Sequence, residues 1–333
     1  MTNVQRTGRQ ERPDNGLPRA WTVTDGAAGN VRQAQALAAA MAVEVTDWAL
    51  QARAPWRWVA PRRLPGAERA FGPPFAAALA QVPPLVIGCG RQAALATRLA
   101  RARGARAVQI LDPRLDPALW DLLVVPRHDG LCGDNVIQVT GSLHPVDDLW
   151  LAAARREFAP LGRLPGPRTT LLVGGRTHAG DFDIVAFDRW LETLVAHVRA
   201  EGGSVLATTS RRTPPAAIER LRTRLEDVPG VLWVDAAGGT APNPYPGLLG
   251  WADRIVCTAD SVNMLSEAAA THVPVHVAGE AQGRPGRFVT QLLAMGRVRP
   301  LDGPPAPFAV TALRETARVA DEVRQRLARL PAA

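Results

Sequence analysis

The chain has 333 residues, of which 47% are hydrophobic and 21% charged, and its formal net charge is +8. This length exceeds what one hydrophobic core usually holds and fits two domains. No apolar run approaches the roughly 20 residues that a membrane-spanning helix needs. Every basic residue is an arginine, which excludes a Schiff-base lysine and the lysine of a phosphate-binding P-loop.

The positive charge favours an anionic partner, such as a phosphorylated ligand or a membrane surface, although a solvated basic surface explains it equally well. Nucleic acid is not expected as a partner, because the arginines are spread along the chain and only one tyrosine is present. Neither zinc-finger spacing nor the aromatic pattern of an RNA-recognition sheet occurs.

Residues 1–19 form a basic segment, interrupted by Pro and Gly, that we expect to be a disordered tail. It has no apolar core and is not expected to be a signal peptide. The three cysteines, Cys89, Cys132 and Cys257, are far apart, and none belongs to a CxxC pair. We therefore expect no disulfide and no zinc site, and a reducing, cytoplasmic location fits best.

The first predicted domain, 20–160, alternates short apolar strands with amphipathic helices, which is typical of a parallel sheet with helices on both faces. Strands are predicted at 20–26, 43–50, 84–90, 105–113, 119–126 and 135–141. Helices are predicted at 30–41, 91–103 and 146–158, and residues 55–74 are expected to form a loop with short helical pieces.

A Pro- and Gly-rich stretch, 161–168, is the predicted linker to a second domain, 169–302. Strands are predicted there at 169–175, 203–210, 230–235, 253–258 and 274–279, and helices at 182–201, 214–227, 261–271 and within 243–252. Residues 303–333 are expected to carry an amphipathic helix from about 310 to 330. The predicted fold class is α/β, with two Rossmann-like, doubly wound domains that face a central ligand cleft.

Polar clusters follow the ends of the predicted strands, where this architecture places its ligands. In TDGAAGNVRQ (24–33), Gly26 and Gly29 allow tight turns, and the following helix offers N–H groups to an anion. The glycine spacing differs from GxGxxG, so a dinucleotide fingerprint is not indicated. The alternative is an ordinary strand–helix turn capped by Asp25.

Two further loops of the first domain carry candidate residues. Arg91 would lie at a helix start, where it can meet an anion, or it belongs to an ordinary strand–helix turn. His128 and Asp129 are candidates for a general base and the group that orients it, or for simple loop residues. The other histidines show no metal-ligand spacing, and no metal is expected.

Two neighbouring strand ends of the second domain carry glycines and basic or polar side chains. They contribute Gly174, Gly175, Arg176, Ser210, Arg211 and Arg212. The glycine pair would let the backbone come close to a ligand. The arginines suit a phosphate, and a solvated basic face is the alternative.

The stretch TADSVNMLSEA (258–268) forms a third such end. Thr258, Asp260 and Ser261 can cap the helix that starts near residue 262, and a helix N-terminus favours a phosphate. Glu267 lies one to two turns further on, where its carboxylate can accept hydrogen bonds from a ribose diol. The alternative is a capped core helix whose glutamate is merely exposed.

Three stretches resemble a plant mitochondrial fission family that carries the "elongated mitochondria" name and has many bacterial members. They are WTVTDGAAGNVRQAQALAAAM (21–41), TSRRTP (209–214) and NPYPGLLGWADRIVCTADSVNMLSEAAATHVPV (243–275). The resemblance covers about residues 20–300. Its TDG…GN…Q and TADSVNMLSEA motifs are specific in combination, and they add Asn30, Asn263 and Met264 to the candidate site.

The family's similarity to glycosyltransferases of the GT-B fold implies a nucleotide-sugar site in the second domain. In such enzymes the donor diphosphate binds at a helix N-terminus and the ribose at a glutamate on that helix, and Ser261 and Glu267 match this arrangement. The acceptor would lie near Asp25, Gly26 and Arg91. The C-terminal helix of such folds packs back across the first domain.

The main functional hypothesis is a metal-independent glycosyltransferase that moves a sugar from a nucleoside diphosphate sugar to a glycan or lipid of a bacterial envelope. The nucleotide sugar is a co-substrate, no cofactor is needed, and Asp25 or His128 would be the general base. The enzyme would be cytoplasmic, with peripheral contact to an anionic inner membrane. The fission role is not expected, because the Arg-only, Ala- and Pro-rich composition resembles that of a GC-rich bacterium.

Two other hypotheses stay open. A non-catalytic, GT-B-shaped adaptor would bind a protein or an anionic membrane through the basic tail and the last helix. A sugar-nucleotide epimerase with a bound dinucleotide would need a glycine fingerprint and a Tyr/Lys pair, and the chain has one tyrosine and no lysine.

Overall fold

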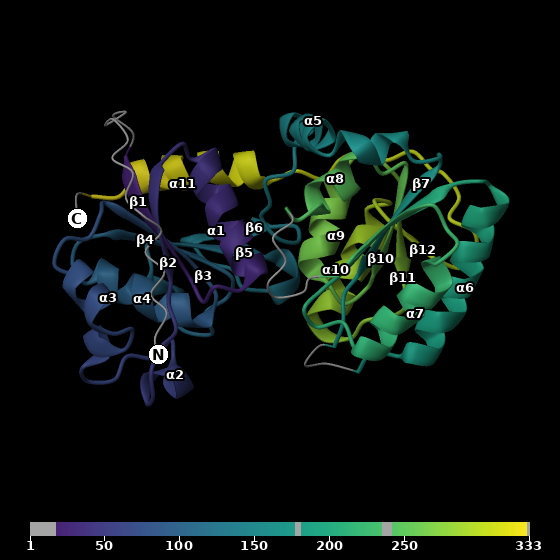
Figure 1. Cartoon of the computed structure of the whole chain (residues 1–333). Coiled ribbons are helices and arrows are strands. Elements are labelled where there is room, and N and C mark those ends of the chain that lie inside the picture. The colour runs from purple at the N-terminus through teal and green to yellow at the C-terminus, as the bar shows by residue number, and fades with distance from the viewer. Residues whose placement is uncertain (1–17, 177–180, 235–241, 332–333) are drawn as a thin grey trace. The chain divides into compact units, whose positions relative to one another are not determined.

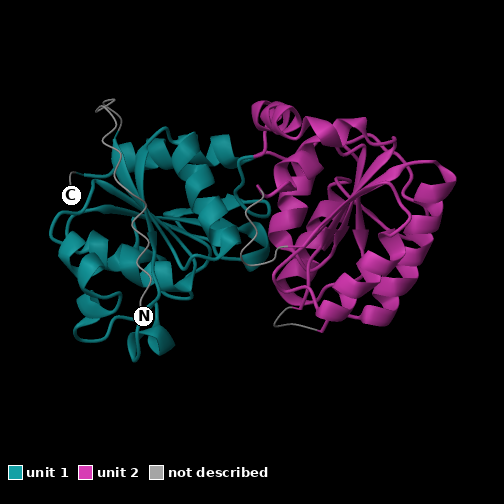
Figure 2. Cartoon of the chain, viewed as in Figure 1, with its two compact units in different colours: residues 1–145, 315–333 teal, residues 146–314 magenta. Residues whose placement is uncertain are grey.

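The computed structural model describes residues 18–176, 181–234 and 242–331. The chain forms two compact units (Figure 2). Unit 1 comprises residues 1–145 and 315–333, and unit 2 comprises residues 146–314. Of the predicted tail, only Pro18 and Arg19 lie within the described residues, and Arg19 already begins the first strand.

Unit 1 is built on a six-stranded parallel sheet with the strand order β2-β1-β3-β4-β5-β6. Its strands are β1 Arg19–Thr24, β2 Glu44–Ala49, β3 Leu85–Cys89, β4 Arg106–Ile110, β5 Leu122–Pro126 and β6 Val136–Val139. Its helices are α1 Ala28–Ala40, α2 Trp56–Val59, α3 Pro73–Ala78, α4 Arg91–Arg101 and α11 Thr316–Ala328, with short 3-10 turns η1 Ala67–Arg69, η2 Pro117–Leu119 and η3 Arg127–Asp129.

The sheet of unit 1 is covered on both faces. Trp21 and Val23 of β1 pack with residues of α3 and α4, whereas Ala20 packs on the other side with α1 and α11. Figure 1 shows α1 and α11 on one side of this sheet and α3 and α4 on the other. Successive side chains of a strand point to opposite faces, so a strand buried on both sides is apolar at nearly every position. This explains the continuous apolar runs that the sequence shows in place of strict alternation.

Unit 2 repeats the architecture with the strand order β12-β11-β10-β7-β8-β9, again parallel throughout. Its strands are β7 Arg168–Val173, β8 Ser204–Thr209, β9 Gly230–Trp233, β10 Arg254–Thr258, β11 Val275–Ala278 and β12 Arg299–Pro300. Its helices are α5 Asp148–Glu157, α6 Ile184–Ala200, α7 Pro215–Leu225, α8 Tyr245–Gly250, α9 Val262–Ala269 and α10 Gly283–Ala294, with a 3-10 turn η4 Ala159–Arg163.

Both faces of the second sheet are covered too. Leu171 and Val173 of β7 pack with α6 and α7, and Leu172 packs with α8, α9 and α10. In each unit the chain winds outward in both directions from a central pair of strands, β1 and β3 in unit 1 and β7 and β10 in unit 2. Such a switch point leaves room for ligands at the carboxyl ends of the two strands.

The boundary between the units lies between residues 145 and 146, and not in the predicted linker 161–168. Leu151 of α5 belongs to the core of unit 2. A Cβ on Gly162 would lie 2.5 Å from the ring of Trp251, so only glycine fits there. The composition of this stretch therefore reflects close packing inside unit 2 and not a flexible connection.

The C-terminal region also differs from its predicted extent. Residues 303–314 belong to unit 2, and the helix starts at Thr316 instead of about residue 310. Val319, Ala320 and Val323 of α11 are fully buried in the core of unit 1, beside α1. The hydroxyl of Thr316 donates to the carbonyl of His144 at 2.8 Å and fixes the start of the helix.

Helix α10 was not predicted from the sequence. Its first turn contains Gly283, Pro285 and Gly286, which are usually read as loop residues. Proline and glycine are tolerated in a first turn, because the N–H groups there have no partner within the helix. The signal for this helix was the spacing of Phe288 and Leu292, which are four residues apart and fully buried.

Candidate functional site at the carboxyl ends of the strands

The carboxyl ends of β7 and β10 are joined by two hydrogen bonds that cross the switch point of unit 2. The amide of Gly174 donates to the Thr258 hydroxyl at 2.8 Å, and the amide of Gly175 donates to the Asp260 carboxylate at 2.7 Å. The structure thus brings together two strand ends that are 84 residues apart in sequence. The side chains of Thr258 and Asp260 therefore accept hydrogen bonds from the loop after β7, whereas the sequence suggested that they cap the helix starting near residue 262.

The glycines at 174 and 175 are required by the packing of the chain itself. A Cβ on Gly174 would lie 2.1 Å from Oδ2 of Asp260, and a Cβ on Gly175 would lie 2.1 Å from the carbonyl oxygen of Arg212. The sequence suggested that this pair opens room for a ligand. In the structure the room is filled by the Asp260 side chain and the peptide after Arg212.

A tight turn after β8 presents the two arginines of the predicted phosphate cluster. The amide of Ser210 donates to the carbonyl of Val173 at 2.9 Å, and the amide of Arg212 donates to the Ser210 hydroxyl at 3.2 Å. The Thr213 hydroxyl closes the turn by donating to the Val173 carbonyl at 3.1 Å. The turn therefore holds its backbone in place and leaves both arginine side chains at the surface.

The two arginines differ in how they are held. Arg212 donates to the carbonyl of Arg176 at 2.6 Å and lies 3.5 Å from the carboxylate of Asp260. Its side chain is still 46% exposed. Arg211 is exposed and forms no ion pair with any residue that the structure describes. Arg211 is thus the less constrained of two cations at this edge, and both can reach an anion.

Helix α9 begins at the same edge. Ser261 is its N-cap, and the Ser261 hydroxyl accepts a long hydrogen bond of 3.5 Å from the amide of Met264. Asn263 and Met264 are half-buried in the first turn. The positive end of the helix dipole therefore lies beside Asp260 and the turn that carries the two arginines.

Glu267 lies inside unit 2 and not at its surface. The residue is 2% exposed, and one carboxylate oxygen accepts a hydrogen bond of 2.5 Å from the hydroxyl of Tyr245. The sequence suggested that this carboxylate binds a ribose diol, with a merely exposed glutamate as the alternative. Tyr245 was missed at that stage, although it is the single tyrosine of the chain.

The corresponding edge of unit 1, at the ends of β1 and β3, is occupied by neutral groups around Asp25. One oxygen of the Asp25 carboxylate accepts from the amide of Ala27 at 3.0 Å and from the side-chain amide of Asn30 at 2.9 Å. The thiol of Cys89 contacts the Asn30 carbonyl oxygen at 3.6 Å. Burial, reinforced by the nearby Asp25 charge, raises the pKa of Cys89, so this thiol stays protonated.

Only one of the two glycines predicted to shape this turn does so. Gly26 has φ +81°, a conformation that favours glycine, and it forms the turn. Gly29 is the second residue of α1, which begins two residues before the predicted start at residue 30. A Cβ on Gly90 would lie 2.6 Å from the amide nitrogen of Asn30, which explains the glycine before α4.

The remaining candidates of unit 1 are not gathered around Asp25. The side chain of Arg91 is exposed and donates to the carbonyl of Arg57 at 3.3 Å. The imidazole of His128 lies 4.0 Å from the Asp129 carboxylate, and the two side chains are only 4% and 2% exposed. His128 follows β5, three strands from β1, so it is separated from Asp25 by roughly 14 Å at about 4.8 Å per strand.

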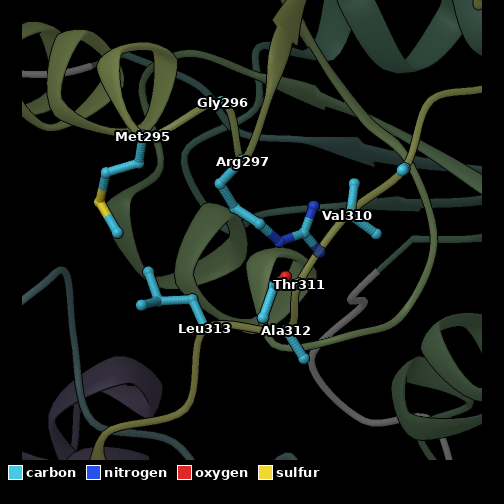
Figure 3. A pocket seen from close by; sticks show the side chains of 8 residues that line it. Met295, Gly296, Arg297, Val310, Thr311, Ala312 and Leu313 are labelled. Atoms are coloured by element: carbon cyan, nitrogen blue, oxygen red, sulfur yellow. The ribbon is translucent and has the colours of Figure 1, made fainter.

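A cavity of about 330 Å³ lies elsewhere in unit 2, between Met295–Arg297 and Ala309–Leu313. Figure 3 shows Arg297 extending across it toward Val310 and Thr311. The Arg297 guanidinium donates to four backbone carbonyls at the C-terminal end of α9, those of Ala268, Ala269, Thr271 and Val273. Burial lowers the pKa of Arg297 to about 10. This arginine caps α9 and stabilises the fold.

No group of three or more His, Cys, Asp or Glu side chains in residues 18–176, 181–234 and 242–331 is arranged to hold a metal ion. No helix in these ranges combines the length and the apolar character needed to cross a bilayer.

Comparison with solved structures shows the fold. A UDP-N-acetylglucosamine 2-epimerase described as putative, from Listeria monocytogenes, matches 94% of this chain and 88% of its own, with a TM-score of 0.52 and 12% identity. The UDP-N-acetylglucosamine 2-epimerase from Rickettsia bellii matches 94% of this chain and 96% of its own, also with a TM-score of 0.52 and 12% identity. The expected fold class, two Rossmann-like α/β domains of the GT-B type, is confirmed. The cleft between them stays a prediction.

Sequence comparison shows the family. The "Mitochondrial fission protein ELM1" of Arabidopsis thaliana is 30% identical over 282 residues, which are 74% of this chain and 64% of the plant protein. This chain therefore spans less than two thirds of that relative. An uncharacterised protein of Rickettsia prowazekii is 22% identical over 304 residues, which are 77% of this chain and 82% of the relative. The family described as "Mitochondrial fission ELM1" matches residues 28–327, and the chain belongs to that family.

Proposed function

We propose that unit 2 binds the diphosphate of a nucleoside diphosphate sugar and that the protein is a metal-independent glycosyltransferase. The observation that carries this proposal is the position of Arg211 and Arg212. Both are exposed at the carboxyl edge of the sheet, next to the N-terminus of α9 and at the switch point of unit 2. Guanidinium groups and a helix N-terminus both favour phosphate oxygens.

In the proposed reaction the bond between the sugar and the diphosphate breaks while negative charge grows on the leaving diphosphate. Arg211, Arg212 and the positive end of α9 would stabilise that charge more strongly in the transition state than in the bound substrate. These fixed groups perform the task that a metal ion performs in other enzymes. A glycan or lipid acceptor is proposed at the carboxyl edge of unit 1.

Between the two candidate bases, the geometry favours Asp25. Asp25 is half-buried at the switch point of unit 1, and the amides that it accepts from fix the orientation of its carboxylate. The His128 side chain is almost fully enclosed within its own loop. A general base must reach the acceptor hydroxyl within hydrogen-bond distance.

The test is a calorimetric titration of uridine and guanosine diphosphate into the wild type and into single variants. Arg211→Gln is expected to weaken binding about 10- to 100-fold, which is the usual loss for one charge-assisted hydrogen bond. Arg212→Gln should act similarly, with some loss of stability because its contact with Asp260 also disappears. Unchanged affinity in both variants would contradict the proposed diphosphate site.

Arg91→Gln is the matched control for this titration. Arg91 is also an exposed arginine at a carboxyl edge, but it belongs to unit 1 and donates to the carbonyl of Arg57. Its substitution changes the net charge by the same amount and is expected to alter diphosphate affinity by less than about twofold. An equal loss in all three variants would indicate a general effect of charge.

A non-catalytic adaptor is the second candidate, and two observations favour it. Glu267, the expected ribose ligand, is 2% exposed and already bonded to Tyr245. The Arabidopsis relative is named for a role in mitochondrial fission. Absence of binding for every nucleoside diphosphate and nucleotide sugar, with the protein folded, would favour the adaptor.

Both candidates are proposed to act in the cytoplasm. Cys89 and Cys257 are buried free thiols and Cys132 is an exposed free thiol, which fits a reducing compartment. The membrane contact expected through the last helix needs revision. Its apolar residues Val319, Ala320 and Val323 are buried in unit 1, so α11 has no such face to offer to a bilayer.

A further inference from the structure

The segment 53–69 of unit 1 combines exposed apolar side chains with a high density of positive charge. Trp58 is 66% exposed and Leu64 is 36% exposed. The segment contains five arginines and one glutamate, a net charge of +4. The five arginines, Arg53, Arg57, Arg62, Arg63 and Arg69, are all exposed.

The segment is a compact loop that is attached to unit 1 by one side only. The indole of Trp56 donates to the carbonyl of Pro65 at 3.4 Å and ties the two halves of the loop together. Arg98 of α4 donates to the carbonyl of Pro61 at 2.7 Å. Ala60 and Ala67 are buried in the core formed with α3 and α4. Figure 1 shows α2 at the rim of unit 1.

The two tryptophans of α2 differ in their surroundings. Trp56 packs against the core and uses its indole N–H inside the loop. Trp58, two residues later in the same short helix, has most of its surface in water. Leaving a tryptophan and a leucine exposed has a cost in solubility, so such side chains usually mark an interaction surface.

We propose that segment 53–69 is a membrane-docking surface that binds anionic lipid headgroups and inserts Trp58 and Leu64 at the interface of the bilayer. The inference is independent of the sugar-transfer proposal, since none of its residues belongs to the diphosphate site. Trp58 suits the boundary between headgroups and acyl chains, where an indole places its apolar body in the lipid and its N–H near water. The surrounding arginines are complementary to anionic headgroups.

A bilayer fits these features better than the other polyanions do. Single-stranded nucleic acid would stack bases on Trp58, but Leu64 offers no ring for stacking and fits acyl chains. Arginine can extend its apolar stem along lipid while the guanidinium stays with the phosphates. The single acidic residue, Glu68, is half-buried and lies 3.5 Å from Arg63, so little negative charge faces outward.

The experiment is co-sedimentation of the full chain with vesicles of phosphatidylcholine alone and with about one third phosphatidylglycerol. Wild type is expected to bind the anionic vesicles only, and more weakly as salt is added. Each arginine near an anionic surface contributes roughly fivefold to binding, so the triple variant Arg57→Gln, Arg62→Gln, Arg63→Gln should bind about 100-fold less. Trp58→Ala should reduce binding about tenfold.

Matched controls test whether the location of the charge matters. The triple variant Arg103→Gln, Arg156→Gln, Arg329→Gln removes three other exposed arginines and changes the net charge equally. Leu149→Ala removes a leucine that is 82% exposed on α5. Both controls are expected to bind the anionic vesicles within about threefold of wild type, since they leave segment 53–69 unchanged.

Insertion is tested separately with vesicles whose acyl chains carry bromine, which quenches a tryptophan that enters them. The nine tryptophans of the wild type should show partial quenching, and Trp58→Phe should abolish it while keeping vesicle binding. The proposal is overturned if wild type binds no vesicles, if the two triple variants bind equally, or if quenching persists without Trp58. Binding of an oligonucleotide that requires Trp58, without vesicle binding, would assign the surface to nucleic acid instead.

Discussion

The two switch points of this protein share one architecture and differ in their chemistry. At the ends of β1 and β3, the carboxylate of Asp25 is engaged by an amide N–H and by Asn30, and a protonated thiol lies next to them. At the ends of β7 and β10, Asp260 holds a loop amide, and two exposed arginines follow the neighbouring strand. With the same strand geometry, the edge of unit 1 carries the carboxylate of Asp25 and the exposed Arg91, whereas the edge of unit 2 carries more positive charge.

A glycine at a strand end of this protein need not mark a ligand. In unit 1, Gly90 makes room for Asn30. In unit 2, Gly174 and Gly175 make room for Asp260 and for the backbone of Arg212. In both units the small residue lets the chain close on itself, and the capacity to bind an anion depends on which side chains remain exposed afterward.

The largest loss of stability is expected when a side chain is added at Gly175, where the backbone of unit 2 is tightly packed. Gly175→Ala would place a Cβ 2.1 Å from the carbonyl oxygen and 2.2 Å from the carbonyl carbon of Arg212, so the backbone must shift. We expect a loss of about 3 kcal/mol in the free energy of unfolding, measured by urea denaturation. Gly303→Ala is the control, since nothing lies within 4 Å of its Cβ, and it should change stability by less than about 0.5 kcal/mol. If Gly175→Ala leaves the free energy of unfolding unchanged, this edge of the sheet is open and can accommodate a ligand.

A smaller effect is expected from the buried pair in unit 2. Tyr245→Phe removes the hydroxyl that donates to Glu267 and leaves a buried carboxylate with one hydrogen bond fewer, at a cost of about 2 kcal/mol. The measurement is a double-mutant cycle with Glu267→Gln, in which the loss caused by Tyr245→Phe should shrink by at least half.

The same cycle separates a structural glutamate from a ligand-binding one. If Glu267 only stabilises the fold, the folded Tyr245→Phe variant should bind nucleotide within about twofold of the wild-type affinity. If Glu267 binds a ribose, affinity should fall together with stability, and the double variant should not recover it. Equal stability of Tyr245→Phe and wild type would show that the hydrogen bond contributes nothing to folding.

Much of the fold was predictable from the sequence, because most buried strands are short apolar runs followed by an α-helix. The strands from β1 to β11 were expected within about three residues of their observed positions. The domain boundary was not, since Gly162 looks like a linker residue until Trp251 is known to lie against it. Helix α10 was missed because local composition outweighed the spacing of Phe288 and Leu292.

The candidate site was predictable in part, for a similar reason. Sequence patterns place polar residues at strand ends, so the cluster around Arg211, Arg212 and Asp260 could be expected. Patterns do not show which way a side chain points. The burial of Glu267 depends on Tyr245, which is 22 residues away, and the enclosure of His128 depends on how its own loop folds.

The smallest effect concerns His276, a buried residue of β11 in unit 2. Burial lowers the pKa of His276, while its hydrogen bonds with the carbonyls of Ala306 and Pro300 oppose the shift and the charges of Arg254 and Arg299 add to it. The unfolded chain therefore binds a proton more readily than the folded chain just below about pH 6.5. Stability is expected to fall as the pH drops through this range, and to be insensitive to this group above it. His276→Gln should flatten the decline in melting temperature between about pH 7 and 5. The pKa of Glu201 is also lowered, but this carboxylate affects the pH dependence of stability only below its usual pKa of about 4.5. A decline of the same slope in the variant would mean that other groups, and not His276, carry the pH dependence of unit 2.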